Sequence, residues 1–215
     1  MDITRRHLLL LTPAAAAFLS RLGGAEPAAP ENKYDMAQHY WGMLIDIEKC
    51  IGCGNCVRAC ETENGVPAGY FRTWVERYSV TGWEEDHPEV DSPNGGHDGF
   101  PDKPRPAAKN FFVPKLCNHC AHSPCVQVCP VGATFESPDG LVLVDKCTLC
   151  YHRISQGETT ACSETCPTQA RRLVDLKNPK DPVHEFLRNN SVQVLKPHMA
   201  TGSKVFYRAL DMAVR

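Results

Sequence analysis

The chain has 215 residues and a formal net charge of −2, so it lacks the excess of positive charge that marks a nucleic-acid-binding protein. Its 17 Pro and 15 Gly indicate many loops, and its 12 Cys restrict its function more than any other feature. The sequence contains no evident nucleophile–base pair and no glycine-rich phosphate loop, so we expect the chain itself not to be an enzyme.

The first 25 residues have the layout of a cleaved export signal. Arg5 and Arg6 precede an apolar stretch from Leu8 to Leu22, and small residues follow up to Ala25. The paired arginines indicate the twin-arginine type of signal. The stretch is about 15 residues long, shorter than the roughly 20 that a membrane helix needs, so we favour a signal over an uncleaved anchor. We therefore predict a periplasmic protein with no membrane span of its own after cleavage.

Short β-strands are predicted beside each group of cysteines. Apolar segments lie before each group and after the last one, at residues 42–47, 111–114, 141–144 and 170–176. A turn is expected at 138–140, and further strands at 70–78 and 204–207. The rest of residues 61–110 is rich in Pro, Gly, Asn and Asp, and we expect it to be a long loop.

The twelve cysteines form three runs of four. The first run (Cys50, Cys53, Cys56, Cys60) reads C-x2-C-x2-C-x3-C, the middle run (Cys117, Cys120, Cys125, Cys129) reads C-x2-C-x4-C-x3-C, and the last run (Cys147, Cys150, Cys162, Cys166) reads C-x2-C-x11-C-x3-C. A cubane iron–sulfur cluster needs three thiolates from one tight loop and a fourth from farther away. The first run has that spacing, with a short helix expected from Cys56 to Cys60. The runs therefore predict iron–sulfur clusters and electron transfer.

Zinc and disulfides are the alternatives. Zinc also binds C-x2-C pairs, and the last run alone has the spacing of a zinc ribbon. Disulfides are common in exported chains with an even number of cysteines. However, a zinc ribbon has no use for the third and fourth cysteines of the first run, and C-x2-C neighbours would close only very small loops. We therefore favour clusters.

Four cations lie close to cysteines in the sequence, namely Arg58, Lys146, Arg153 and Arg171. Positive groups and N–H donors near cluster sulfurs raise the reduction potential. The alternative is that these residues are ordinary surface charges.

Three segments resemble a known family. They are Cys50-Ile51-Gly52-Cys53-Gly54-Asn55-Cys56, Cys117-Asn118-His119-Cys120, and Lys146-Cys147-Thr148-Leu149-Cys150 with Cys166-Pro167. The chain resembles, over about residues 39–210, the electron-transfer (beta) subunits of complex iron–sulfur molybdoenzymes, such as the beta chains of tetrathionate, polysulfide and dimethyl sulfoxide reductases. The resemblance implies two partners, a molybdopterin catalytic subunit and a polytopic quinone-reactive membrane subunit. It implies an exported relay of a respiratory oxidoreductase that is held at the membrane by a partner.

The fold that the resemblance implies is α+β and bacterial ferredoxin-like, a twofold ββα-type cluster module with long loop insertions. The expected parts are a signal peptide at 1–25, a ferredoxin-like module made of 26–66 and 142–180, an insertion at 67–141 with the middle run, and a C-terminal extension at 181–215. The insertion would be a truncated second module, because the family usually has four cysteine runs. The run that normally precedes Cys147, about thirty residues long, is missing here.

Ligation in twofold ferredoxins is crossed, since the fourth Cys of one run ligates the cluster of its partner run. By resemblance the first and last runs are partners, which implies one [4Fe-4S] cluster held by Cys50, Cys53, Cys56 and Cys166, and another held by Cys147, Cys150, Cys162 and Cys60. The middle run has lost its partner. Either Cys129 completes a third cluster with Cys117, Cys120 and Cys125, or that site holds three irons or none.

A self-contained iron–sulfur reductase is a further alternative to the electron-transfer subunit. It would need an active-site cofactor, and we find no motif for one in the sequence.

Overall fold

The computed structural model describes residues 33–81, 88–102, 106–143 and 146–214. The chain divides into two units, residues 1–33 and 34–215, and the helices and strands described below lie in the second. The expected signal peptide, residues 1–25, lies outside the described residues. In the described part, no helix combines the length and the apolar character that crossing a membrane requires.

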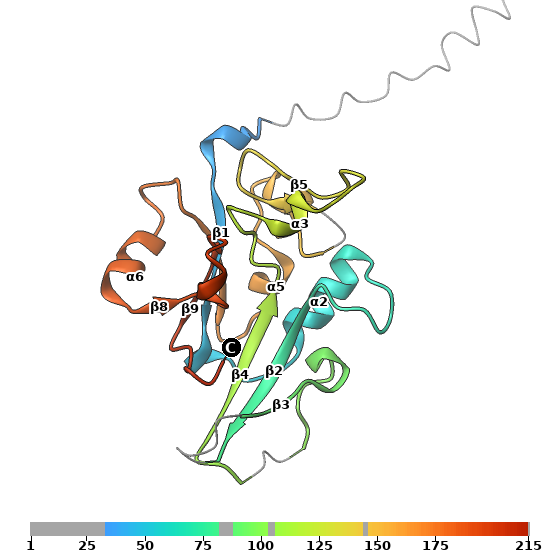
Figure 1. The fold of residues 1–215 in the computed structure, drawn as a ribbon, viewed down its shortest axis with the longest axis vertical. Coiled ribbons are helices and arrows are strands. Elements are labelled where there is room, and N and C mark those ends of the chain that lie inside the picture. The colour runs from blue at the N-terminus through green and yellow to red at the C-terminus, as the bar shows by residue number, and fades with distance from the viewer. Residues whose placement is uncertain (1–32, 82–87, 103–105, 144–145, 215) are drawn as a thin grey trace, which may run out of the picture. The chain divides into compact units, whose positions relative to one another are not determined.

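A four-stranded sheet forms one side of the second unit (Figure 1), with the strand order β7-β1-β9-β8. Its strands are β1 (Trp41–Asp46), β7 (Arg171–Asp175), β8 (Val192–Gln193) and β9 (Val205–Arg208). β1 pairs antiparallel with β7 and parallel with β9, and β8 pairs antiparallel with β9. The strands expected at 42–47, 170–176 and 204–207 are confirmed to within one or two residues.

The two faces of β1 serve two different cores, because side chains alternate across a strand. Met43 and Ile45, both 0% exposed, belong to the main core. Leu44 points the other way and packs with Val174 against the helix α6 (Val183–Asn189). This helix was not anticipated from the sequence; it is short and covers a small apolar patch of the sheet.

A second, three-stranded antiparallel sheet has the order β3-β2-β4. It consists of β2 (Thr73–Val80), β3 (Glu89–Asp91) and β4 (Lys109–Leu116), with Thr73 opposite Leu116 and Val80 opposite Lys109. The strand expected at 111–114 is confirmed and is longer, while the one expected at 70–78 begins three residues later. The expectation of a loop over the rest of 61–110 is wrong at β3 and at the 3-10 helix η4 (Pro93–Gly96). An ion pair between the buried Arg77 and Asp91 fixes β3 to β2.

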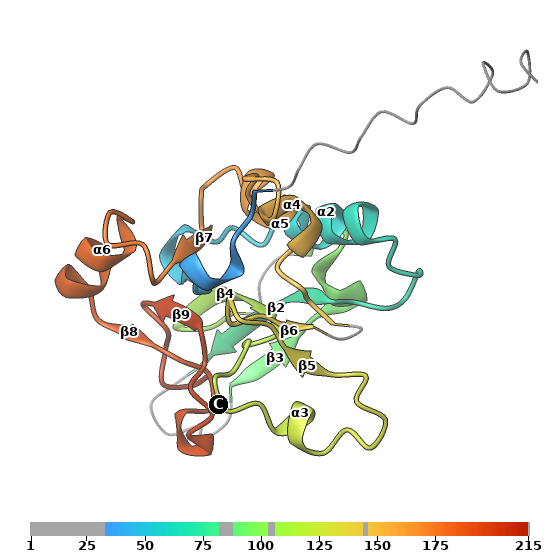
Figure 2. The ribbon, with the colours of Figure 1, turned by 90° about the horizontal axis from the view of Figure 1, so that it is seen from above.

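The cysteine runs are carried by three helices and one small lobe. α2 (Asn55–Asn64), α4 (Tyr151–Ile154) and α5 (Ala161–Glu164) lie together above the strands in Figure 2, and α2 packs against α5. The middle run lies in the lobe that contains α3 (Pro124–Gln127) and the pair β5 (Phe135–Glu136) and β6 (Val142–Leu143). The turn at 138–140 is confirmed, and the strand expected at 141–144 is β6. Two short 3-10 helices, η2 (Met36–Gln38) and η5 (Pro197–Met199), lie outside these groups.

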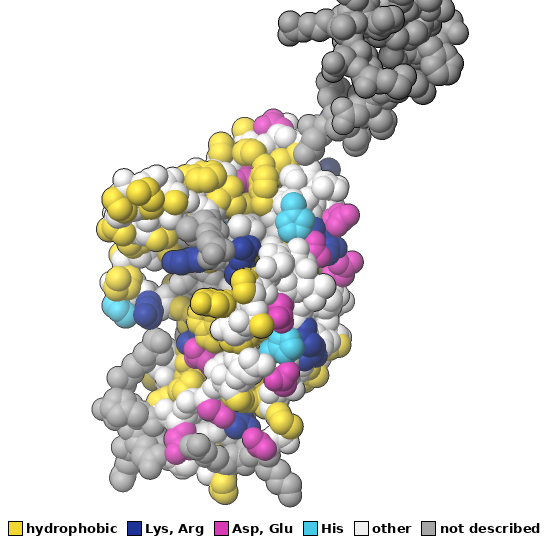
Figure 3. All heavy atoms as spheres, turned by 90° about the vertical axis from the view of Figure 1, so that its right-hand side faces the viewer, with side chains coloured by type: hydrophobic (Ala, Val, Ile, Leu, Met, Phe, Trp, Pro, Cys, Tyr) yellow, Lys and Arg dark blue, Asp and Glu magenta, His cyan; other side chains and the backbone are white. Residues whose placement is uncertain are grey.

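The main core contains cysteines as well as apolar side chains. Cys147 and Cys162 are buried in it beside Leu149, Ile154 and Tyr207. The fold is thus a mixed α/β arrangement in which the sheets and short helices enclose the cysteine runs. Outside this core, acidic and basic side chains lie side by side on the face shown in Figure 3, in line with the low net charge.

Candidate metal centres

Four cysteines from two distant runs line one pocket, here called the first pocket. They are Cys50, Cys53, Cys56 and Cys166. The pocket encloses about 330 Å³ of empty space, counted with the solvent at its mouth. Cys50 and Cys53 come from the loop between the 3-10 helix η3 (Ile47–Lys49) and α2, Cys56 lies in the first turn of α2, and Cys166 comes from the segment between α5 and β7.

Glycines allow the cysteine loop of the first pocket to close. Gly54 has φ +75°, and a Cβ there would lie 2.4 Å from the carbonyl oxygens of Gly96 and His97. Only glycine tolerates both the left-handed conformation and this close approach. Arg58 then fixes the loop, because it donates to the carbonyl oxygens of Cys53, at 3.0 Å, and of His97. The guanidinium of Arg58 therefore stabilises the backbone of this loop and is not a free surface charge.

We expect Gly54→Ala to prevent assembly of the first pocket. The added Cβ collides with two backbone oxygens, which cannot move as a flexible side chain could. The control is Gly65→Ala, because Gly65 also has positive φ (+56°) but nothing within 4 Å of an added Cβ. The control should lose only the backbone preference of glycine, about 1 kcal/mol. Cluster absorbance per chain and thermal unfolding of both variants measure this, and equal absorbance in the two would contradict it.

The second pocket gathers the other four cysteines of the outer runs. They are Cys60, Cys147, Cys150 and Cys162, around about 310 Å³ of empty space measured in the same way. Asn64 Nδ2 donates to Cys60 Sγ at 3.6 Å and to Cys150 Sγ at 3.9 Å, so it joins two runs. Cys60 therefore lies with the last run, whereas the other cysteines of its own run lie in the first pocket.

The loop of the last run has an unusual backbone. Leu149 and Cys150 have φ of +50° and +51°, although neither is glycine. Such conformations cost of order 1–3 kcal/mol each and persist where the surroundings fix them. Leu149 is 1% exposed in the main core, and Cys150 begins α4. Packing of Leu149 thus holds Cys147 and Cys150 on either side of one tight turn.

The lining of both pockets fits a metal group held by thiolates. Each pocket is lined by four cysteine side chains. In the described ranges, no three His, Cys, Asp or Glu side chains are already gathered as the ligands of one metal ion. Four thiolates are the donor set of an iron–sulfur cluster and also of a zinc ion, so the lining by itself is compatible with both.

The buried thiols need a cationic partner to become ligands. Burial raises the pKa of Cys50 to about 11 and of Cys60 to about 12, and it raises the pKa of Cys147 well above the usual value. At neutral pH these groups alone would be protonated thiols. A coordinated metal deprotonates a thiol outright, so this donor set suits a metal that binds thiolates. At Cys166 the backbone helps, because Ala170 donates its N–H to Cys166 Sγ at 3.2 Å.

The middle run is arranged differently. The sulfur of Cys117 interacts with those of Cys120 and Cys125, and burial raises the pKa of Cys117. Cys129 instead accepts hydrogen bonds from the backbone of Thr134, Val131 and Ala133, which lower its pKa. Three cysteines of the run are thus close together, while the thiol of the fourth is held by its own turn. Whether they bind a third cluster stays a prediction.

His119 connects the middle run to β6. It is 0% exposed, and its Nδ1 accepts from the Val142 N–H at 3.0 Å. Burial lowers its pKa to about 3, so the ring is neutral. Lys146 is exposed, and Arg153 forms ion pairs with Glu63, Glu158 and Glu164 near the surface. Of the four cations noted in the sequence, Arg171 alone lines a cysteine pocket.

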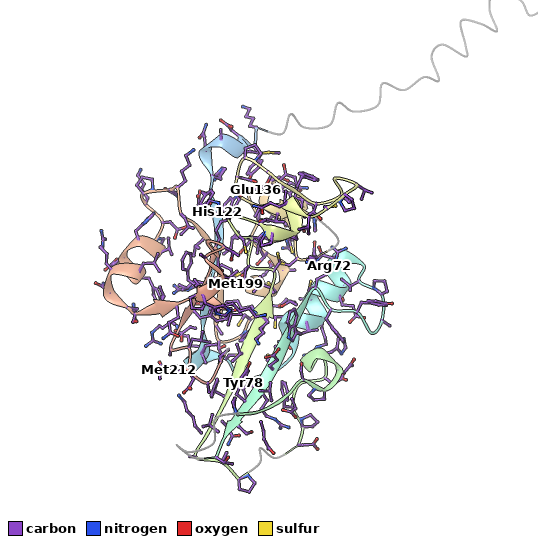
Figure 4. The ribbon with its side chains drawn as sticks, in the orientation of Figure 1. Arg72, Tyr78, His122, Glu136, Met199 and Met212 are labelled. Atoms are coloured by element: carbon purple, nitrogen blue, oxygen red, sulfur yellow. The ribbon has the colours of Figure 1, made fainter. Side chains whose placement is uncertain are left out.

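The sequence reasoning missed two residues of the second pocket, Thr73 and Arg72. Thr73 begins β2 and is 2% exposed, and Arg72, labelled in Figure 4, precedes it. Neither is near a cysteine in the sequence. The pairing of β2 with β4 carries them to the pocket, and no local pattern in the sequence reveals that pairing.

Relatives of this chain are found among the subunits of respiratory reductases. The chain is 35% identical to a subunit of the tetrathionate reductase of Salmonella typhimurium, over 99% of this chain and 91% of the relative. It is 36% identical to the corresponding tetrathionate reductase chain of Archaeoglobus fulgidus, over 78% of this chain and 81% of the relative. It is 26% identical to the arsenate respiratory reductase iron–sulfur subunit of Shewanella, over 77% of this chain and 94% of the relative.

The alignment with the Salmonella protein extends over 247 positions, more than the 215 residues of this chain. That relative therefore contains residues that have no counterpart here, and the absence of one cysteine run stays a prediction.

Two family models match the cysteine-bearing segments. Residues 49–133 match one described as a 4Fe-4S dicluster domain, and residues 142–176 match a second with the same description. The two matched ranges together contain all twelve cysteines. The chain belongs to the family of 4Fe-4S dicluster iron–sulfur subunits that includes these two tetrathionate reductase chains.

Proposed function

We propose that this chain is the electron-transfer subunit of a respiratory reductase and binds [4Fe-4S] clusters in both pockets. One cluster would be held by Cys50, Cys53, Cys56 and Cys166, and the other by Cys60, Cys147, Cys150 and Cys162. A bound cluster supplies a site that accepts and releases one electron without transfer of atoms. The observation that carries the proposal is the composition of the pockets, each of which combines three cysteines of one outer run with the fourth of the other.

The closeness of the two pockets supports transfer between them. Arg171 lines the first pocket and donates through Nη1 to Thr73 Oγ1 at 2.8 Å, and Thr73 lines the second. One pair of side chains thus spans the protein between the two sites. Electron tunnelling falls steeply with distance, so neighbouring buried sites favour a relay.

The partners in this proposal are a molybdopterin catalytic subunit and a polytopic quinone-reactive membrane subunit, and the site of action is the periplasm. Two observations support it. The relatives are named as subunits of reductases, and a subunit acts in a larger complex. The paired Arg5 and Arg6 before an apolar stretch indicate export in the folded, cofactor-loaded state.

Spectroscopy and metal analysis of the protein, purified without oxygen, test the proposal. We expect a broad visible absorption, and iron and acid-labile sulfide that account for at least two clusters per chain. An amount equal to three clusters would show that the middle run binds one as well. A colourless protein that contains zinc would overturn the proposal, and turnover of tetrathionate or another oxyanion by the isolated chain would favour the self-contained reductase.

Replacement of Arg5 and Arg6 by Lys should keep the chain in the cytoplasm, because the twin-arginine signal depends on these two side chains. Arg21→Lys is the matched control, since it makes the same change in the same segment but outside the pair. Fractionation of cells and the size of the exported chain measure the outcome. Equal export of both variants would rule out the twin-arginine signal.

A further inference from the structure

Arg171 is a charged side chain inside the main core. It lies on β7 opposite Ile45 of β1, is 2% exposed and is the largest of the fully buried side chains in the described part. Its Nη1 donates to Thr73 Oγ1 at 2.8 Å. Its Nε and Nη2 have no hydrogen-bond partner among the described residues.

A buried guanidinium with two nitrogens that lack a hydrogen-bond partner is costly unless an anion faces it. Arg171 lines the first pocket together with Cys56. Its hydrogen-bond partner Thr73 lines the second pocket together with Cys162. The guanidinium is therefore linked to the candidate ligands of both pockets.

We propose that Arg171 is a positioning residue shared by the two cluster sites, and that its guanidinium raises the reduction potentials of both. The inference rests on the proposed function. A cluster held by four thiolates is anionic, and it gains one more negative charge when it takes up an electron. A fixed positive charge in the low-dielectric core favours the reduced form and weakens the repulsion between the two anionic sites.

The other cations near the pockets do not have this position. Arg58 is used by backbone carbonyls, and Arg153 is neutralised by surface glutamates. Arg72 lines the second pocket only. The shared position of Arg171 follows from its register on β7, since the next residue, Arg172, points to the other face and lies 5.0 Å from the ring centre of Phe186.

The test is a redox titration of the cluster-loaded protein. The electron paramagnetic resonance signal of each reduced cluster is recorded at each potential and gives the reduction potential of that cluster. The variants are Arg171→Met, Arg171→Lys and, as the matched control on the same strand, Arg172→Met. We expect Arg171→Met to lower the electron affinity of both clusters at least tenfold, which is 59 mV or more for a one-electron couple. Arg171→Lys should restore part of the shift, and Arg172→Met should leave both potentials unchanged.

Thr73→Val gives a second route if Arg171→Met fails to hold its clusters. The substitution keeps the shape of the side chain but removes the hydroxyl that fixes Nη1, so both potentials should still shift. Unchanged reduction potentials in Arg171→Met would overturn the inference. If Arg171→Met binds no clusters, unchanged potentials in both Arg171→Lys and Thr73→Val would overturn it. A shift confined to one cluster would overturn the shared role. A wild-type chain without clusters would instead overturn the proposed function.

Discussion

Replacement of Cys60 by Ala should remove the cluster of the second pocket and leave that of the first intact. Cys60 lines the second pocket with Cys147, Cys150 and Cys162, and Asn64 donates to both Cys60 and Cys150. Loss of one of four thiolates leaves an incomplete donor set, and burial raises the pKa of the remaining Cys147 and Cys150 thiols, which favours their protonated form when no metal is bound. Iron per chain should therefore fall by the content of one cluster.

Double variants identify which cluster is lost. Cys60→Ala with Cys147→Ala should contain as much iron as Cys60→Ala alone, because both residues serve one site. Cys60→Ala with Cys50→Ala should lose the iron of two clusters, because these residues line different pockets. If the second pair instead lost no more than one cluster, Cys60 would complete the site of its own run and the crossed scheme would be wrong. Cys129→Ala is the control and should leave both outer clusters in place.

Removal of the clusters by a chelator under oxidising conditions should destabilise the fold strongly. The main core contains Cys147 and Cys162, and burial raises the pKa of Cys147 well above its usual value, so without metal this thiol is neutral. The Nε and Nη2 atoms of the buried Arg171 then have no hydrogen-bond partner among the described residues. Structural metals contribute about 10 kcal/mol to the folding of small zinc domains, which is comparable to the total stability of a domain. A loss of even about 5 kcal/mol would lower Tm by roughly 10–20 °C in a chain of this size.

Calorimetry of the loaded and metal-free protein measures this loss, after any disulfides formed during cluster removal have been reduced again. Arg171→Met supplies an internal control. It removes the unpaired charge, so it should melt at a higher temperature than the wild type when both are metal-free. The same Tm for the loaded and metal-free wild type would show that the apolar core alone holds the fold.

The fold was partly readable from the sequence, and the readable part is local. Strands at β1, β4 and β7 follow from short apolar segments beside the cysteine runs, β9 follows from an apolar segment near the end of the chain, and α2 follows from the spacing of Cys56 and Cys60. The helix α6 and the strand β3 were missed. Each is short, and each is stabilised by a distant partner, α6 by Leu44 and Val174 and β3 by Arg77. Segments of that kind carry little periodic signal of their own.

The sequence by itself determined the number of cysteines, their grouping into three runs and hence the kind of cofactor, because cluster ligation depends on spacing within a tight loop. Only the tertiary structure decided how the four cysteines of each pocket, which the resemblance had implied as ligand sets, come together: Cys60 of α2 and Cys162 of α5 line one pocket because these two helices pack together. It also decided which cation matters: Arg171 and Arg172 are neighbours of equal charge, and the alternation of side chains along β7 buries one between the two pockets and turns the other away.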